Sequence, residues 1–232
     1  MKKNLAGIIV DVFLVAVLAA LYALTALPEA RAAMATAYNA PAYRGQAEDA
    51  LAIQFAVDWD ASALGGILDA LKEKDVRVTF AVSGEWADNN PGLVRRIAEE
   101  GHELASMGYH PDEDEGLKGT VSDISRSVEA IEALSGQRPL AYYSGSRNAT
   151  ISSRAAKKLS LAHVLCTIDL MCAKGVKDDI ISRASTGAFA GSIILMQPTQ
   201  TALEALPQII DELDRKGLRA VRTRDIVDYG IL

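Results

Sequence analysis

Short apolar segments alternate with longer stretches of helical periodicity along most of the chain. The apolar segments are nearly continuous in apolar residues, which is typical of parallel strands that are buried on both faces. The expected strands lie at about 51–57, 76–82, 102–107, 139–143, 162–168, 191–196 and 218–221. The expected helices lie at about 61–74, 90–100, 119–135, 150–160, 176–188 and 199–216. This alternation predicts repeated βαβ units, arranged as a parallel barrel or an open doubly wound sheet.

Local signals support two of the helix boundaries. Asn90 is a candidate N-cap with Pro91 at the first helical position, where proline is preorganised and needs no hydrogen-bond acceptor. Gly101 and Gly217 follow the last turns of two expected helices, as glycines in the left-handed conformation often do.

The N-terminus is typical of an export signal. Lys2 and Lys3 precede an apolar stretch at 12–27 that contains no charged residue, and this stretch predicts an apolar helix. Residues 30–32 have the small-residue pattern of a signal-peptidase site, so residues 1–32 are interpreted as a signal peptide or a signal anchor in the membrane. The pattern slightly favours the anchor.

The export signal sets the expected domain organisation. Residues 33–48 are small, polar and without periodicity, which predicts a tether. The folded domain is expected over 49–232. Because positive charges remain in the cytoplasm, this domain is expected outside it, either anchored to the membrane or secreted.

Charge and cysteine content exclude several classes of partner. The formal net charge is −6, and no run of Lys or Arg lies beside aromatic residues, so nucleic acid is not expected as a partner. Cys166 and Cys172 have no second Cys/His pair at zinc-finger spacing. A disulfide between them stays open, while buried free thiols are the favoured interpretation.

Both architectures place functional side chains at the carboxyl ends of the strands. The segments that follow the expected strands therefore contain the candidate chemistry. They are DWD at 58–60, SGEW at 83–86, GYHP at 108–111, YSGSR at 143–147, DLM at 169–171 and QPT at 197–199.

Three long segments of the chain resemble the framework of the polysaccharide deacetylases of the NodB-homology family. They are LDALKEKDVRVTFAVSGEWADNNPGLVRRIAEEGHEL at 68–104, IEALSGQRPL at 131–140 and GSIILMQPTQTALEALPQIIDELDRKGLRAV at 191–221. The resemblance extends over 51–226 and implies a distorted (β/α)7-type barrel. It also implies a metal held by one Asp and two His, a neighbouring Asp as the base and a distant His as the acid.

The first family motif, T-F-D-D-G, falls on QFAVD at 54–58, so Ala56 occupies the position of the base. Some relatives have F-D-x-D, and by that comparison Asp58 would be the metal carboxylate. An aspartate that caps the helix expected near Ala61 is the favoured interpretation of Asp58, and Asp60 has better spacing for the same role.

The second motif, H-x-x-x-H, falls on the segment that ends MGYHP at 107–111, so Met107 replaces the first imidazole. His110 matches the second imidazole only if one residue is deleted between them. A thioether is a poor ligand for the divalent ions that such chemistry uses. His102 belongs to the framework, where a satisfied hydrogen bond at the strand start is expected.

The remaining motifs have also changed. R-P-P-Y-G falls on YSGSR at 143–147, so Tyr143 replaces the orienting arginine, and a surface cation is the simpler interpretation of Arg147. D-x-x-D-W falls on 169–173 and keeps only Asp169. L-M-H falls on LMQ at 195–197, so Gln197 replaces the histidine. The amide of Gln197 cannot shuttle a proton as an imidazole can.

A catalytic metal site needs about three protein ligands and an open position. The substitutions therefore predict an exported deacetylase-like protein that binds or acts on N-acetylated cell-wall glycan, peptidoglycan or a chitin-like polymer, without catalytic residues or a resident metal. The expected groove residues are Asp58, Trp59, Met107, Tyr109, Tyr143, Asp169 and Gln197.

Two alternatives stay open. One is an active deacetylase whose rewired zinc site uses Asp58 and His110 with Asp112 or Asp114. The other is an exported scaffold that binds a protein partner. Glycan binding would use aromatic rings that stack on sugars, although core packing is favoured for each ring taken singly. The candidate rings are Trp59, Trp86, Tyr109, Tyr142 and Tyr143.

Overall fold

The structure is a computed structural model that describes residues 5–26, 40–59, 62–113 and 116–230. The chain divides into two compact units, Met1–Ala40 and Pro41–Leu232. The first contains α1 (Leu5–Ala26), the apolar helix expected from the sequence, and the described side chains of this helix at 10–22 are all exposed. Among the helices that the structure describes, none combines the length and hydropathy needed to cross a membrane. Residues 30–32 lie outside the described residues, so export stays a prediction.

The second unit is built on one curled sheet in which all paired strands are parallel. Its strands are β1 (Ala50–Val57), β2 (Thr79–Val82), β3 (Glu103–Ser106), β4 (Ala141–Tyr143), β5 (Ala162–Val164), β6 (Ile168–Asp169), β7 (Ile193–Met196) and β8 (Arg219–Val221). Their order is β5-β4-β3-β2-β1-β7-β6, and β8 also pairs with β1. This arrangement confirms the distorted parallel barrel implied by the resemblance.

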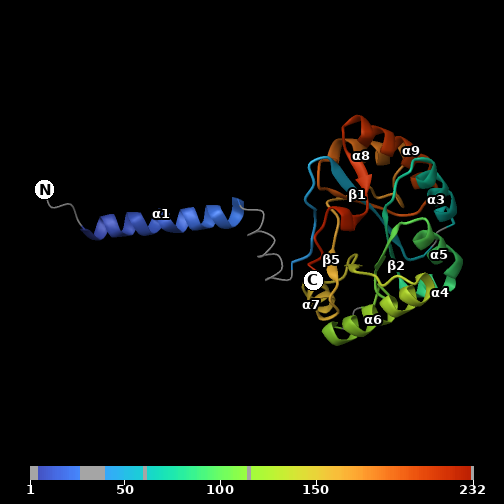
Figure 1. Ribbon diagram of the computed structural model, residues 1–232, viewed down its shortest axis with the longest axis horizontal. Coiled ribbons are helices and arrows are strands. Elements are labelled where there is room, and N and C mark those ends of the chain that lie inside the picture. The colour runs from blue at the N-terminus through green and yellow to red at the C-terminus, as the bar shows by residue number, and fades with distance from the viewer. Residues whose placement is uncertain (1–4, 27–39, 60–61, 114–115, 231–232) are drawn as a thin grey trace. The chain divides into compact units, whose positions relative to one another are not determined.

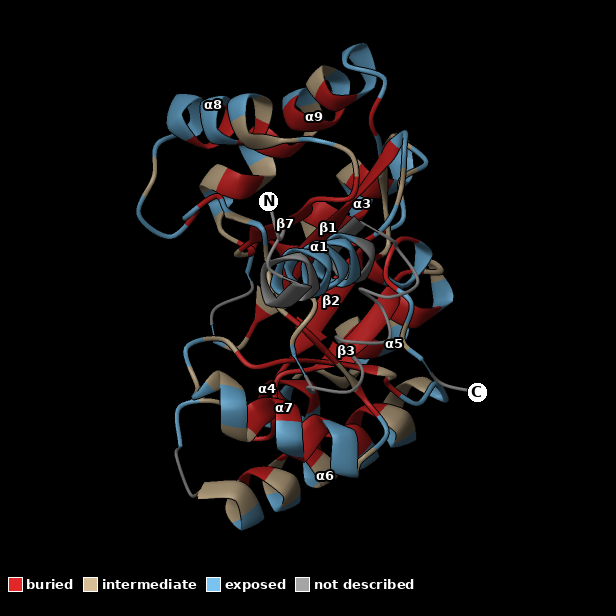
Figure 2. Cartoon of the chain, turned by 90° about the vertical axis from the view of Figure 1, so that its left-hand side faces the viewer, coloured by how far each residue is buried: buried red, intermediate tan, exposed pale blue. Residues whose placement is uncertain are grey.

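Helices cover the outside of the sheet, as Figure 1 shows. They are α3 (Leu64–Glu73), α4 (Gly84–Asn89), α5 (Pro91–Glu99), α6 (Gly116–Ser135), α7 (Ala149–Lys158), α8 (Lys177–Gly187) and α9 (Gln200–Arg215), and a short 3-10 helix follows at Thr223–Asp225. Strands β1 to β5 and β7 are buried almost throughout, whereas these helices are buried mainly on the sides that face the sheet (Figure 2). The apolar periodicity of the helices is thus explained by this packing.

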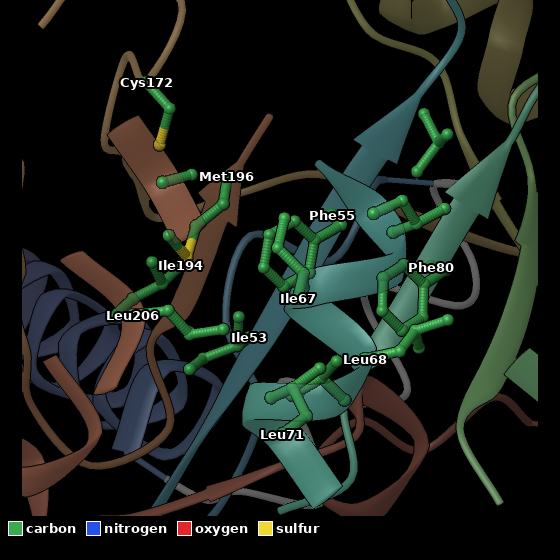
Figure 3. Close-up of a cluster of buried hydrophobic side chains, with 14 of the residues drawn as sticks. Ile53, Phe55, Ile67, Leu68, Leu71, Phe80, Cys172, Ile194, Met196 and Leu206 are labelled. Atoms are coloured by element: carbon green, nitrogen blue, oxygen red, sulfur yellow. The ribbon is translucent and has the colours of Figure 1, made fainter. Parts of the chain in front are cut away.

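Alternating side chains of the strands form two separate layers of the core. In β1, Leu51, Ile53 and Phe55 point outward and pack against the helices, with Phe55 stacked on Phe80 of β2 at a centroid distance of 5.2 Å (Figure 3). Ala50 and Ala52 belong to the second layer, inside the curl of the sheet. We call this second layer the barrel interior. Its members are Ala50, Ala52, Ala81, Ala105, Met107, Ala141, Tyr143, Val164, Ile193, Leu195, Ile226 and Val227.

The segment 41–46 connects two parts of the sheet that do not pair directly. Ala42 forms a parallel bridge with Val164 of β5, and Arg44 forms an antiparallel bridge with Ser192 just before β7. Gly45 passes so close to Ile226 that a Cβ atom would collide with its backbone. The folded unit therefore begins at Pro41, and the expected tether at 33–48 is wrong for its last eight residues. Residues 33–39 lie outside the described residues.

Two expected elements are divided in the structure. The strand expected at 162–168 splits into β5 and β6, because Leu165 donates its backbone N–H to Ala42 and thereby pairs with the segment 41–46. An additional helix, α4, precedes the helix expected at 90–100. Its six residues are too few to show helical periodicity, and its N-cap is Ser83, whose Oγ accepts the backbone N–H of Trp86 at 3.2 Å.

The predicted helix ends are confirmed. Pro91 is the first residue of α5 after the N-cap Asn90. The Asn90 side chain, however, donates to the carbonyl of Trp86 at 2.9 Å and makes no capping bond to α5. Gly101 and Gly217 have φ of 79° and 72°, in the left-handed region where glycine carries no Cβ penalty.

Candidate functional site

The register of the sheet sets four candidate residues in one row. Val57 of β1 is paired with Val82 of β2, and Val82 is paired with Ser106 of β3, which in turn is paired with Tyr142 of β4. The residues one step further along these strands are Asp58, Ser83, Met107 and Tyr143. We call these four residues the carboxyl-end row. Three of them were predicted from the sequence, and Ser83 was not singled out.

Asp58 is the acidic member of the carboxyl-end row. Burial raises the pKa of its carboxyl group, a hydrogen bond from Ser83 counteracts this, and the charges of Asp112 and Glu85 raise it further. The positive charge of Arg147 favours the ionised form of Asp58 and lowers its pKa. The expected helix-capping role of Asp58 is wrong, because the N-cap of α3 is Ala63 and no side chain caps it. Asp60 lies outside the described residues.

The two side chains predicted to stand at the positions of the family's base and first imidazole are apolar. Ala56 packs against the barrel interior beneath Asp58, and Met107 belongs to that interior with only 6% of its surface exposed. Tyr143 is buried beside them, and burial raises the pKa of its phenol well above the usual range. None of these three groups can accept a proton from water near neutral pH.

Gln197 and Asp169 form a second part of the site, at the ends of β7 and β6. The Gln197 Nε2 donates to Asp169 Oδ1 at 3.3 Å, and the same carboxylate oxygen accepts the backbone N–H of Met171 at 2.8 Å. With its amide nitrogen committed in this way, Gln197 has a buried carbonyl oxygen, Oε1, for which the structure shows no hydrogen-bond partner. That oxygen is a buried acceptor, and a ligand would reach it only after a change in the side-chain conformation.

The loop that carries His110 is fixed by Arg147. Arg147 lies in the interior of the protein with 8% of its side chain exposed, and its Nη1 pairs with Asp123 Oδ2 at 2.9 Å. Its Nε donates to the carbonyl of Pro111 at 2.7 Å, and its Nη2 donates to the carbonyl of His110. The expectation of a surface cation is therefore wrong.

The aromatic candidates differ strongly in exposure. Trp59 follows Asp58 and is 63% exposed, whereas Trp86, Tyr142 and Tyr143 are buried. Tyr109 is also buried: its hydroxyl donates to Asp88 at 2.7 Å, and the guanidinium of Arg126 lies 3.4 Å from its ring centroid. Among the five predicted rings, Trp59 is thus the one whose face is accessible to a sugar.

The residues present do not fit a catalytic metal. His110 Nδ1 lies 3.5 Å from Glu85 Oε2, and Met107 is packed in the barrel interior. Within the part of the chain that the structure describes, no group of three or more His, Cys, Asp or Glu side chains is arranged to hold a metal ion. Asp114 lies outside it.

The two cysteines are free thiols, Cys172 buried and Cys166 partly buried, and no disulfide joins them. Burial raises the pKa of Cys172 to about 11 and also raises that of Cys166. Both thiols are therefore protonated near neutral pH and unreactive as nucleophiles.

A shallow cavity of about 310 Å³ lies at the opposite ends of the strands. It is lined by residues that precede β2 and β3, among them Arg77, Glu100 and His102. The Nδ1 of His102 accepts the backbone N–H of Val78 at 3.1 Å, which confirms the structural hydrogen bond expected for this residue. The cavity is remote from the carboxyl-end row and has no part in the candidate site.

The residues near the candidate site that the sequence did not single out are Ser83, Glu85 and Asp123. Ser83 and Glu85 lie in a segment that follows an expected strand, so their position was the available signal. Asp123 lies inside α6, 24 residues before Arg147, and nothing in the helical pattern distinguishes it from a solvated aspartate.

Comparison with known proteins first defines the class of fold. The curled parallel sheet is also found in the solved structure of a CE4-family pseudoenzyme from Bacillus anthracis, with a TM-score of 0.78 over 82% of this chain and 72% of that one. The two sequences are 24% identical, so this likeness shows the fold alone. Mutation is described as restoring enzymatic activity to that protein.

The sequence then defines the family. Residues 45–164, more than half of the chain, match the family model for polysaccharide deacetylase, and the chain therefore belongs to that family. The uncharacterized protein YlxY of Bacillus subtilis is 29% identical over 194 residues, which cover 81% of this chain and 60% of YlxY. A peptidoglycan-N-acetylglucosamine deacetylase of Bacillus cereus is 32% identical over 169 residues, which cover 67% of this chain and 60% of that enzyme. The chain spans about 60% of the length of these two curated relatives.

Proposed function

We propose that the folded unit binds N-acetylated cell-wall glycan, peptidoglycan or a chitin-like polymer, without hydrolysing it. The observation that carries this proposal is the composition of the carboxyl-end row and the layer beneath it. Ala56 and Met107 stand where the family's base and first imidazole would be, and both pack against apolar neighbours. Loss of general acid–base assistance typically costs a factor of roughly 10²–10⁴ per group.

The same end of the barrel retains groups that recognise sugars. The Trp59 ring is exposed and offers an apolar face on which a sugar ring can stack. The Asp58 carboxylate, which is half-buried, can accept hydrogen bonds from sugar hydroxyl groups. The relatives that are named as peptidoglycan deacetylases support a cell-wall glycan as the ligand.

The proposal includes export of the folded unit. Support comes from Lys2 and Lys3 followed by the apolar helix α1, the arrangement that directs the rest of a chain across a membrane. Protease added to intact protoplasts is expected to remove the folded unit. Full-length protein that survives this treatment would refute the topology.

The decisive experiment compares glycan binding with acetate release for the purified full chain. Wild type is expected to bind chitooligosaccharides or peptidoglycan fragments in the presence of EDTA and to release no acetate. Trp59→Ala is expected to weaken glycan binding about fivefold, which is the change in affinity that the loss of one aromatic contact causes. Phe189→Ala is the matched control, because Phe189 is 42% exposed but precedes β7 at the opposite end of the sheet.

The alternatives are separate outcomes of this experiment. About one equivalent of zinc in wild type, together with acetate release that is lost in His110→Gln, would establish the rewired enzyme. Protein that neither binds glycan nor releases acetate would favour the scaffold. Restoring Ala56→Asp, Met107→His and Gln197→His in one chain tests how far the lost groups alone explain inactivity.

A further inference from the structure

The guanidinium of Arg147 is surrounded by oxygen atoms from four different residues. Backbone carbonyls of His110 and Pro111, a carboxylate oxygen of Asp123 and, at 3.5 Å, the hydroxyl of Tyr142 all face its guanidinium. Such a convergence of oxygen atoms is the environment expected around a cation. Here the cation is part of the chain.

Asp123 completes the arrangement from α6. Its Oδ2 accepts from Arg147, while its Oδ1 accepts the backbone N–H of His110 at 2.8 Å. The Asp123 carboxylate thus binds both the Arg147 guanidinium and the backbone of the loop at His110. Both side chains of the pair are nearly buried, with exposed fractions of 8% and 13%, so the pair is screened far less than a surface salt bridge.

The backbone of the loop is shaped to fit this pair. Gly108 has φ of 91°, and a Cβ atom there would collide with Asp123 and lie 3.0 Å from Arg147 Nη1. The Oγ of Ser106 accepts the Gly108 N–H at 3.0 Å, which directs the chain into the turn. The loop from Gly108 to Pro111 therefore closes directly on the ion pair.

We propose that Arg147 is a positioning residue that replaces a bound metal as the cation organising the 108–111 loop, so that this wall of the candidate site is formed without metal. The positive charge of Arg147 also acts on the carboxyl-end row, because it favours the ionised form of Asp58. The role in ligand binding rests on the proposed glycan site, whereas the order of the loop does not.

Amide hydrogen exchange and glycan affinity test this proposal on the full chain. Arg147→Met removes the charge and keeps an unbranched stem. We expect the His110 amide to exchange about tenfold faster or more, because the hydrogen bonds from the charged guanidinium to the loop are lost. We also expect glycan to bind about tenfold more weakly at the same folded fraction. Arg147→Lys keeps the positive charge but loses the several coplanar N–H donors of the guanidinium. We expect intermediate effects on the exchange rate and on glycan affinity.

Arg222→Met is the matched control. Arg222 also pairs with a carboxylate, Asp225, at 2.9 Å and donates to a backbone carbonyl, that of Gly101, at 3.3 Å. It lies at the amino end of β3, away from the candidate site. Its loss is expected to lower stability and to leave the exchange of the His110 amide and glycan affinity unchanged. Gly108→Ala, which alters no charge, is expected to act like Arg147→Met.

The outcomes distinguish this proposal from the proposed function. Unchanged exchange of the His110 amide in Arg147→Met would overturn it. Loss of protection in wild type upon EDTA treatment, restored by zinc, would also overturn it, because a metal would then be the organising cation. Faster exchange in Arg147→Met with EDTA-insensitive protection in wild type supports it, even if wild type binds no glycan and the proposed function fails.

Discussion

The two ends of the barrel interior are built from different chemistry although they belong to the same strands. At the amino end, Glu103 of β3 is buried and has a partner for each carboxylate oxygen. Oε2 accepts from Thr79 Oγ1 at 2.7 Å and from the backbone N–H of Arg224 at 3.1 Å, and Oε1 accepts from the Tyr229 hydroxyl at 2.7 Å. The guanidinium of Arg224 lies 3.2 Å from Oε1.

The carboxyl end has the opposite character. Asp58 is only half-buried and is surrounded by further acidic groups, the Gln197 Oε1 has no partner, and Trp59 is exposed. Satisfied buried polar groups rigidify a structure, whereas unsatisfied ones and exposed aromatic rings are retained where a ligand can use them. The amino end also has buried polar atoms for which no hydrogen-bond partner is described, Thr223 Oγ1 and Glu100 Oε2. The two ends therefore differ in the network around Glu103, which favours stability at the amino end, and in the exposed ring of Trp59, which favours ligand contact at the carboxyl end.

The largest effect is expected from removing the central group at the amino end. Glu103→Ala leaves Tyr229, Thr79 and Arg224 without their shared acceptor and should lower the free energy of unfolding by about 3–5 kcal/mol. Urea unfolding measures this change. Asp169→Ala at the carboxyl end, where the carboxylate is exposed, should cost about 1 kcal/mol or less. Equal losses in the two variants would remove the distinction between the ends.

Acid should destabilise the folded unit through two buried imidazoles. Burial lowers the pKa of His102 and of His163 to about 4, from 6.5 for the free side chain. His102 lies next to the amino end, and His163 is the middle residue of β5, where its ring lies between Ser153 of α7 and Ser144. Because the folded pKa is depressed, their contribution is complete above pH 6.5 and is lost as the pH falls towards 4.

Each imidazole should account for at most about 3 kcal/mol of this loss. The free energy of unfolding, measured in urea at pH values between 7 and 4.5, should therefore fall, and His163→Gln should reduce the slope. Between pH 7 and 8 both imidazoles are neutral, and the two proteins should show no difference in slope. An unchanged acid slope in His163→Gln would contradict the role of burial.

The smallest effect is expected at Asp58. Its pKa is raised in the folded protein, mainly by burial, so ionisation of this group costs stability as the pH rises through the folded pKa. Asp58→Asn should therefore raise the free energy of unfolding at pH 7 by less than about 1 kcal/mol, and the gain should vanish below pH 3.8. Asp225→Asn, which weakens the pair with Arg222, should have the opposite sign. A loss of stability in Asp58→Asn at pH 7 would contradict the burial of this carboxylate.

Most of the fold could be predicted from local pattern, while parts of the site could not. The strands before Asp58, Met107, Tyr143 and Gln197 were recognisable as apolar segments, and their parallel arrangement brings the residues that follow them to one end of the sheet. The short helix α4 and the entry of the chain at Pro41 were missed, because the first has no periodicity and the second is held by residues more than a hundred positions away.

The sequence by itself determined the alternation of strands and helices and the family, and it predicts the loss of the base, the first imidazole and the acid at Ala56, Met107 and Gln197. These follow from short-range periodicity and from residue identity at motif positions. Only the tertiary structure decided that Arg147 is an interior cation rather than a surface one. Its acceptors at His110, Pro111 and Asp123 are 24 to 37 residues away along the chain, and they meet it only because β3, α6 and the segment after β4 converge. The energy of such a contact depends on burial and on distance in space, which local sequence pattern does not encode.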